Sequence, residues 1–437
     1  MPHKPDETAP HWNHRLTAIK ERLSRLYHGI KSEGASRLVA IFFATMGRWK
    51  EELTRGASVM NDSFDSDARL FQKRILVVDH KVITPDRDSA SYRMFNLLKL
   101  LQRMGYGVWF SSIHLEYDKS YSEALRKEGI LLLTQENARS VSHFIDLHGS
   151  AFDLLLFSRI TVFEKLADHG ACFSPKTRLI FDTVDLHFLR EERMAAYTKS
   201  IAMAKAAESM KRRELEAVRK SDLTLVVSPY EKALLERLAP GNPIEIVSNI
   251  HEVSHEGKPF HERRGLLFIG GFDHRPNIDA MLFFVKDIFP LIQKRMVSPI
   301  TLHIVGSNPP EKIRKLASAH IVVTGYVADV SLFFENARVF VAPLPYGAGV
   351  KGKVNMSMSY GLPVVGTSIA AEGMAAIDGE NILVADEPAA FAGKVLQIYS
   401  DEALWRHISE KSREVIESSF SIEIAEERLR KSIGSMG

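Results

Sequence analysis

The 437-residue chain has a single cysteine, Cys172, which excludes an internal disulfide and a cysteine-based zinc cluster. No apolar run reaches the length that spans a bilayer, and the longest near the start, Leu38–Met46, is far too short. The opening MPHKPDETAP lacks the apolar core of a signal peptide. A net charge of +3 is too small to indicate a nucleic-acid partner. From these absences we expect a globular protein in the reducing cytoplasm.

Residues 1–70 are predicted to form a helical, basic, amphipathic extension followed by a linker. Apolar residues recur at three- and four-residue spacing from Leu16 to Ile30, and lysines and arginines surround them. Such a surface can lie on an anionic membrane or dock on a partner helix, so residues 11–55 are a candidate membrane or protein contact. Packing on the chain's own globular body explains the stripe equally well.

From residue 71 onward, short apolar runs alternate with helical stretches. Strands are predicted near 74–79, 108–111, 153–157, 178–182, 223–227 and 244–247, and then near 266–269, 300–305, 321–323, 339–342, 364–365 and 382–384. Alternation of this kind is typical of a doubly wound parallel sheet. We therefore predict an α/β fold with two tandem Rossmann-like domains, 71–250 and 265–415, joined by the polar linker 251–264.

The stretch Val341–Val365, which reads VAPLPYGAGVKGKVNMSMSYGLPVV, is the most informative one. A buried strand is followed by the glycine turn Gly347–Gly349, by Lys351 and Lys353, and by a short helix expected over 353–360. Backbone amides of the turn, the helix N-terminus and two ammonium groups are suited to a phosphate or diphosphate. An ordinary strand–turn–helix crossover with two solvated lysines is the alternative.

This stretch resembles the donor-site signature of the GT-B glycosyltransferases of the family 4 type (group 1), in a bacterial subset. In that signature a Gly-x-Gly-x-Lys-x-Lys-like turn precedes a helix ending in Gly-x-Pro-Val-Val. The resemblance extends from Arg74 to the C-terminus and is densest over 266–374. It implies that a C-terminal helix, 416–437, returns to the first domain.

The resemblance also implies an activity. A retaining glycosyltransferase would move a sugar from a nucleoside-diphosphate-sugar donor to a hydroxyl of a glycan or lipid-linked acceptor, in bacterial cell-surface polysaccharide assembly. It would need no metal and no cofactor other than the sugar nucleotide, which is its substrate. The implied location is cytoplasmic, peripheral on the inner face of the plasma membrane if the extension contacts it.

By this resemblance, the second domain holds the donor. The implied diphosphate-binding residues are Gly270, Gly271, Gly347, Gly349, Lys351 and Lys353, and the implied nucleoside- or sugar-binding residues are Gly306, Tyr326, Val327, Met356 and Glu372. The chain departs from the family where a Glu-x7-Glu pair is usual, because Ala348 and Met356 stand there. A methionine cannot accept the hydrogen bonds of a ribose diol, so Glu372 is the candidate for that role.

A second departure concerns the Arg and Lys that relatives use for phosphate. These positions fall near Phe272 and Asn277, which are uncharged. The resemblance therefore implies that Lys351 and Lys353 supply the positive charge that holds the phosphate. Arg275 is a nearby substitute, although a solvated surface arginine explains it better.

In the first domain, Phe181–Glu192 (FDTVDLHFLREE) carries the densest group of polar residues. Asp185 or His187 is predicted to accept a hydrogen bond from the attacking hydroxyl, and with Lys353 they are the predicted catalytic residues. The other acceptor-side candidates are Asp88, Ser89, Ser91, Arg93, Arg159 and Arg190. A helix cap plus a surface ion pair would also explain Asp185 and Arg190, together with Asp182, without catalysis.

Two other functions remain open at this point. A sugar-nucleotide 2-epimerase would use carboxylates in the same crevice, and a non-catalytic GT-B scaffold subunit of a glycan assembly complex would tolerate Ala348 and Met356. The Asp-x-Asp runs at Asp65–Asp67 and Asp86–Asp88 match the metal motif of the other major glycosyltransferase fold, GT-A. Their places around the first strand are wrong for that motif, so no metal site is predicted.

Overall fold

The computed structural model describes residues 64, 67–253 and 257–434. Leu70–Gly437 form one compact unit. The amphipathic extension and the predicted contact at residues 11–55 lie outside the described residues. Within these residues no helix is both long enough and apolar enough to cross a membrane.

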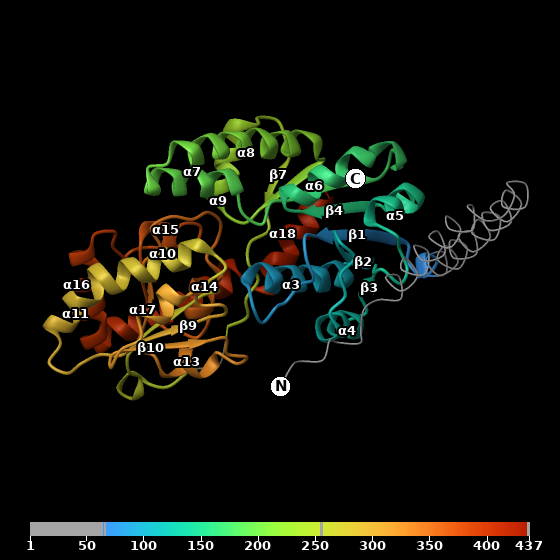
Figure 1. The fold of residues 1–437 in the computed structure, drawn as a ribbon. Coiled ribbons are helices and arrows are strands. Elements are labelled where there is room, and N and C mark those ends of the chain that lie inside the picture. The colour runs from blue at the N-terminus through green and yellow to red at the C-terminus, as the bar shows by residue number, and fades with distance from the viewer. Residues whose placement is uncertain (1–63, 65–66, 254–256, 435–437) are drawn as a thin grey trace, which may run out of the picture. The chain divides into compact units, whose positions relative to one another are not determined.

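The first sheet consists of seven parallel strands in the order β3-β2-β1-β4-β5-β6-β7 (Figure 1). Its strands are β1 (Lys73–Asp79), β2 (Tyr106–Ser112), β3 (Leu131–Leu132), β4 (Leu154–Ser158), β5 (Arg178–Asp182), β6 (Leu223–Val226) and β7 (Ile244–Ile246). Apolar runs fill these strands, and β2 and β4 are buried along their whole length. Burial on both faces is expected when helices cover both sides of a parallel sheet.

The second sheet has six parallel strands in the order β10-β9-β8-β11-β12-β13. Its strands are β8 (Leu266–Ile269), β9 (Leu302–Val305), β10 (Ile321–Gly325), β11 (Val339–Ala342), β12 (Val364–Gly366) and β13 (Leu383–Val384). Both sheets therefore start in the middle and reverse their order once, at β1/β4 and at β8/β11. The predicted α/β fold with two Rossmann-like domains is confirmed.

Helices cover both sheets. Those of the first domain are α3 (Ser89–Arg103), α4 (Lys119–Lys127), α5 (Val141–His148), α6 (Ile160–Leu166), α7 (His187–Thr198), α8 (Ile201–Lys220) and α9 (Pro229–Leu238), with the 3-10 turns η1 (Gly149–Ala151) and η2 (Ala167–Cys172). The remaining helices are η3 (Phe260–Glu262), α10 (Arg275–Phe283), η4 (Phe284–Ile288), α11 (Phe289–Arg295), α12 (Glu311–Arg314), α13 (Ser331–Asn336), α14 (Gly352–Ser359), α15 (Ser368–Ala371), α16 (Pro388–Ser400), α17 (Glu402–Ser419) and α18 (Ile422–Gly434).

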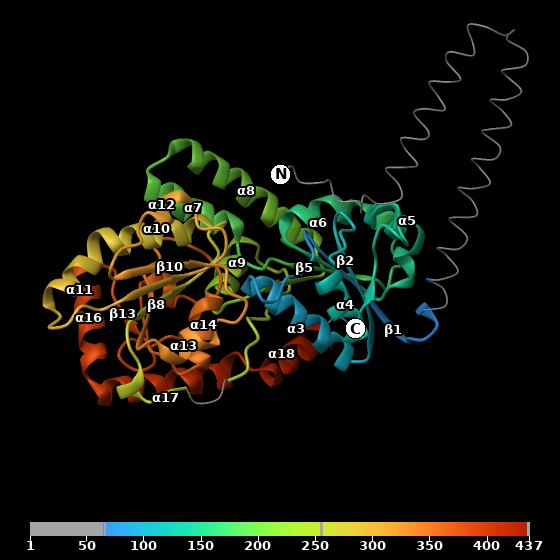
Figure 2. The same ribbon diagram turned by 60° about the horizontal axis from the view of Figure 1, so that its bottom comes forward.

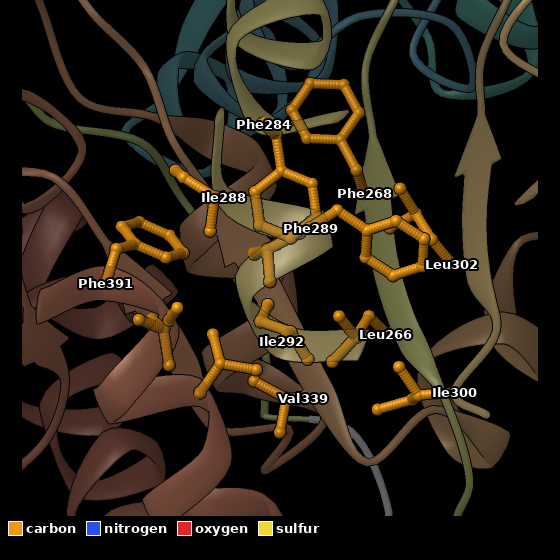
Figure 3. Packing of buried hydrophobic residues seen from close by; sticks show 14 of the residues in the cluster. Leu266, Phe268, Phe284, Ile288, Phe289, Ile292, Ile300, Leu302, Val339 and Phe391 are labelled. Atoms are coloured by element: carbon orange, nitrogen blue, oxygen red, sulfur yellow. The ribbon is translucent and has the colours of Figure 1, made fainter. Parts of the chain in front are cut away.

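The core of the second domain is rich in phenylalanine (Figure 3). Phe284 lies 6.0 Å, ring centroid to centroid, from both Phe289 and Phe391, which brings η4, α11 and α16 onto one face of the sheet. The η4 segment is a π-helix, and Pro290 lies two residues beyond its end, in the first turn of α11. Because proline has no amide hydrogen, it cannot continue the α-helical ladder, and the wider turn is the local solution.

One long helix-favouring run is interrupted in the structure. Ala195–Lys220 is divided between α7 and α8. Lys199 takes a left-handed conformation (φ 54°) that ends α7, and the Ser200 hydroxyl accepts a hydrogen bond from Met203 N to cap α8. Side-chain capping at a serine thus outweighed a high helix propensity over the whole run.

The C-terminal helices connect the two domains. Helix α17 packs on α14 of the second domain, whereas α18 packs on α3 and β7 of the first (Figure 2). Ala425, Leu429 and Ile433 of α18 are buried within the first-domain core. Helix α18 therefore packs on the first domain, the one that contains β1.

Candidate functional site

The glycine turn and its two lysines lie at the carboxyl edge of the second sheet, beside the reversal point between β8 and β11. Gly349 adopts φ +66°, a conformation that favours glycine. Lys351 precedes α14 and is only 7% exposed. Its Nζ donates a hydrogen bond to Gly349 O at 2.6 Å, which folds the side chain back over the turn.

Lys353 reaches toward the neighbouring strand β8. Its Nζ donates to the side-chain oxygen of Asn277 and lies 4.5 Å from the ring centroid of Phe268. The Asn277 amide nitrogen in turn donates to Gly271 O at 2.6 Å. Asn277 therefore orients both Lys353 and the loop of Gly270 and Gly271.

The two ammonium groups have neutral partners. In the described part of the chain, neither Lys351 nor Lys353 forms an ion pair with a carboxylate. Burial lowers the pKa of Lys351 to about 8, and burial together with repulsion from Lys351 lowers that of Lys353 to about 7. Neither ammonium group is in a direct ion pair with another described residue, although Glu372 and Glu231 lie close enough to favour the charge on Lys351, and the arrangement is suited to an anion.

The remaining predicted glycines permit close approach at the same edge. A Cβ added to Gly270 would lie 2.6 Å from Lys353 Nζ, and one added to Gly306 would collide with the carbonyl of Gly270. Glycine at both positions therefore lets Lys353 and the loops after β8 and β9 come together.

His274 is a site residue that sequence reasoning missed. It lies just before α10 and is exposed, and it is close enough to Lys353 and Arg190 for their charges to lower its pKa. Partial desolvation of the imidazole, together with these cations, lowers its pKa to about 4. His274 lies in the segment Gly270–Ala280 (GGFDHRPNIDA), next to Arg275, which is exposed and pairs with Asp279 at 3.4 Å.

On the first domain, Asp185 is the central acidic group. Its carboxylate pairs with Arg190 Nη1, and His187 Nε2 lies 3.4 Å from its other oxygen. Despite the opposing effect of burial, the Arg190 guanidinium, assisted by His187, holds the pKa of Asp185 far below its usual range. Asp185 therefore keeps its charge near neutral pH and is a weak base.

Two buried glutamates fix the loop that carries Asp185. Glu214 of α8 accepts hydrogen bonds from the amides of His187 (3.0 Å) and Phe188 (2.7 Å), and Glu231 of α9 accepts one from Leu186 N at 3.1 Å. Burial raises the pKa of each carboxyl to about 7. Neither residue was predicted, since a glutamate within a helical run gives no sequence signal of this role.

The donor and acceptor sides meet directly. A Cβ added to Gly349 would lie 2.9 Å from the Asp185 Cβ, and one added to Gly352 would collide with Ser89. Asn249 Nδ2 also donates to Asn355 Oδ1 at 3.0 Å, from the segment after β7 to α14. The structure thus brings the predicted Asp185, Ser89 and Gly349 together.

Three acceptor-side candidates, Asp88, Ser91 and Arg93, are hydrogen-bonded to structural partners. Arg93 is 1% exposed, and its guanidinium donates to both carboxylate oxygens of Asp182 (3.0 and 2.9 Å) and to Val247 O. Asp88 caps α3 by accepting from Ser91 N at 2.8 Å. The surface ion pair offered as the alternative for Asp182 is therefore wrong, because its pair with Arg93 is buried. Asp88, a predicted acceptor-side residue, is a helix cap.

Arg159 differs from those three. It has φ +74° and ψ 146°, a strained backbone for a residue other than glycine. Its Nε donates to Asp79 Oδ1 at 3.1 Å, at the reversal point of the first sheet. The predicted acceptor role of Arg159 is compatible with this place.

The predicted nucleoside- or sugar-binding residues have different kinds of contacts. Met356 and Val327 pack against the second-domain core. The Tyr326 hydroxyl donates across the domains to Asp86 at 2.8 Å. Both carboxylate oxygens of Glu372 accept from Arg193. Within the described residues, no group of three histidine, cysteine or acidic side chains is arranged to hold a metal ion.

Comparison with known proteins agrees with this architecture. Residues 263–401 match the family model described as "Glycosyl transferases group 1", so the predicted kinship is confirmed for the second domain. An uncharacterized 44.6 kDa protein in the cps region of Klebsiella pneumoniae is 24% identical over 140 residues. That match covers 30% of this chain and 36% of the Klebsiella protein, about a third of its length.

Solved structures extend the similarity to both domains. Sucrose-phosphate synthase from Thermosynechococcus elongatus superposes with a TM-score of 0.62 at 14% identity, covering 84% of this chain and 99% of that one. Anabaena HepE, solved with UDP and glucose, gives a TM-score of 0.62 at 12% identity, covering 83% and 100%. At such identities the likeness establishes the fold, which is GT-B.

Proposed function

We propose that the chain is a retaining, metal-independent glycosyltransferase. It takes the sugar of a nucleoside-diphosphate-sugar and attaches it to a hydroxyl of a glycan or lipid-linked acceptor, in bacterial cell-surface polysaccharide assembly at the cytoplasmic face of the membrane. The observation that carries the proposal is the pair Lys351 and Lys353, one buried and one partly buried ammonium group beside a glycine turn, neither in a direct ion pair with a carboxylate of the described residues. The cps region named for the Klebsiella relative supports the polysaccharide context.

The chemistry follows from the charges at this edge. The bond between the anomeric carbon and the diphosphate oxygen breaks, and its electron pair leaves with the diphosphate. Lys351, Lys353 and the N-terminus of α14 stabilise that charge. Before the reaction, His187 orients the acceptor hydroxyl by accepting its hydrogen bond. As the acceptor oxygen bonds to the anomeric carbon on the face that the diphosphate leaves, the hydroxyl proton turns to the departing diphosphate and is transferred to it. Asp185 remains ionised and orients His187.

A sugar-nucleotide panel tests the proposal. UDP-, GDP-, ADP- and dTDP-sugars are titrated into the full-length protein by calorimetry, and release of the nucleoside diphosphate is followed with and without glycan acceptors. The UDP-sugars come first because Anabaena HepE was solved with UDP. We expect binding of one donor, turnover that needs an acceptor, and retention of anomeric configuration by NMR.

One observation favours a second function. Ala348 and Met356 replace the usual glutamate pair, and Met356 packs into apolar surroundings. A binding-only GT-B scaffold subunit would tolerate both. No heat with any sugar nucleotide in the panel would favour that scaffold, and conversion of the donor without acceptor would favour an epimerase.

A further inference from the structure

Arg193 lies on the first domain but makes its strongest contacts with the second. It is on α7, the helix that begins at His187. Its Nη1 donates to Gly347 O at 2.7 Å and to Glu372 Oε1 at 2.8 Å, and its Nη2 donates to Glu372 Oε2 at 2.7 Å. One guanidinium thus engages both loops that follow β11 and β12.

These contacts are geometrically specific. The guanidinium and the carboxylate form two parallel hydrogen bonds, the strongest common arrangement of such a pair. The side chains of Arg193 and Glu372 are 20% and 16% exposed, so solvent screens the pair less than a surface ion pair. Tyr230 of α9 lies 5.3 Å from the guanidinium and supports its flat face.

The loop that carries Glu372 is pressed on the first domain at a second point. Gly373 has φ +76°, and a Cβ added there would lie 2.8 Å from the Cβ of Ser228. Arg193 therefore acts where the domains already touch. Its bond to Gly347 O ties this contact to the turn whose amides and lysines form the anion site.

We propose that Arg193 is a positioning residue for the donor. By holding Gly347 and Glu372, it keeps the Gly347–Gly349 turn in the shape that binds a diphosphate and in register with Asp185 and His187. It does so without touching the donor. This inference rests on the proposed function, and it reassigns Glu372 from ribose contact to partner of Arg193.

The first measurement needs no donor. Amide hydrogen exchange is followed in the peptide spanning Gly347–Gly349 for the full-length wild type, Arg193→Ala and Arg213→Ala. Arg213 is a matched control because it forms a two-point pair with Glu164 inside the first domain. We expect at least about fivefold faster exchange of the turn in Arg193→Ala and no change in Arg213→Ala. Unchanged exchange in Arg193→Ala overturns the inference.

The second measurement uses the sugar nucleotide that the panel identifies. Arg193→Ala is expected to raise the donor KM about tenfold while kcat falls much less, and Arg193→Lys, which cannot form the two-point pair, is expected to lie between. Should Arg193→Ala fail to fold, Glu372→Gln takes its place. Equal donor KM in wild type and variant overturns the inference and leaves the proposed function standing.

A double-mutant cycle separates the two assignments of Glu372. If Glu372 acts through Arg193, the variant Arg193→Ala/Glu372→Gln has about the same KM as Arg193→Ala alone. Additive losses would show that Glu372 contacts the donor by itself, against our assignment. If no sugar nucleotide binds the wild type but the exchange result holds, the proposed function fails and so does the donor-positioning role.

Discussion

The carboxyl edges of the two sheets carry opposite chemistry. On the first domain, carboxylates meet cations: Asp79 pairs with Arg159, Asp182 with Arg93, and Asp185 with Arg190. On the second, Lys351 donates to a backbone carbonyl and Lys353 to an amide oxygen. The charged side chains at the carboxyl edge of the first sheet neutralise one another. In the described residues, Lys351 and Lys353 at the second edge have no direct carboxylate partner.

This difference indicates which kind of ligand each edge is suited to bind. An edge whose ion pairs are complete can offer hydrogen bonds to an uncharged hydroxyl without needing a counterion. An edge with a buried and a partly buried lysine beside a glycine turn is stabilised further when an anion binds. Under the proposed function, the first edge serves the uncharged acceptor and the second serves the anionic donor.

Lys353→Ala breaks the positive side of this comparison and has the largest expected effect. Removing the ammonium group that faces the departing diphosphate should lower turnover by about 10²–10³-fold, the usual cost of one preorganised charge-stabilising donor. Release of the nucleoside diphosphate with the cognate donor and acceptor measures it. Lys315→Ala is the control, since Lys315 is 72% exposed and pairs with Glu311 on the same domain. Wild-type turnover in Lys353→Ala would refute the donor-site assignment.

Asp185→Asn tests the neutralised side. The substitution keeps the size of the side chain but removes the charge that pairs with Arg190 and lies beside His187. We expect kcat to fall about 10²-fold with little change in donor KM, because the loss is on the acceptor side. Asp168→Asn serves as the control, as Asp168 forms an exposed pair with Lys220. A rise in donor KM with normal kcat would contradict this assignment.

Gly349→Ala tests the contact between the two edges. Its φ of +66° disfavours alanine, and the new methyl would lie 2.9 Å from the Asp185 Cβ. We expect unfolding free energy to fall by about 1 kcal/mol or more and donor KM to rise several-fold, by thermal melting and kinetics. Gly393→Ala in α16 has open space and no positive φ, so it should leave activity unchanged and stabilise the protein by about 0.5–1 kcal/mol. Equal behaviour of the two variants would argue against the close contact.

The pH dependence of donor binding gives the smallest expected effect. An anionic donor favours protonated Lys353, whose pKa in the free protein is about 7, so affinity should be greatest below pH 7 and fall as pH rises through 7 to 8. Glu231, with a pKa raised to about 7, gains negative charge over the same range and acts in the same direction. His274, with a pKa of about 4, stays neutral there.

Calorimetry from pH 6 to 9 measures this loss, which is at most about tenfold per pH unit for each titrating group. Lys353→Met should flatten the profile. A wild-type affinity that rises with pH would contradict the role of the lysines.

Local features of the sequence sufficed for the fold and for the donor edge. Strands could be read from continuous apolar runs, and the turn at Gly347–Gly349 from glycines placed between a buried strand and a helix. Lys351 and Lys353 could be predicted as part of the same site because they closely follow that turn. The division of α7 from α8 was missed, since the Ser200 cap is weak evidence against a long helix-favouring run.

Partners distant in sequence could not be predicted. Arg93 and Arg159 are both arginines of the first domain, yet one is buried against Asp182 and the other is held with a strained backbone beside Asp79. Their difference depends on strand order, which places β1, β4 and β5 side by side. No single-chain pattern of charges carries that information.

By itself, the sequence determined two alternating β/α series and a glycine turn followed by two lysines, because strand, turn and helix are encoded within a few neighbouring residues. Only the tertiary structure decided which carboxylates are neutralised, that Glu372 pairs with Arg193, and that Gly349 touches Asp185. The last two contacts join residues more than a hundred positions apart. They depend on the packing of both domains, which places α7 beside the turn that follows β11.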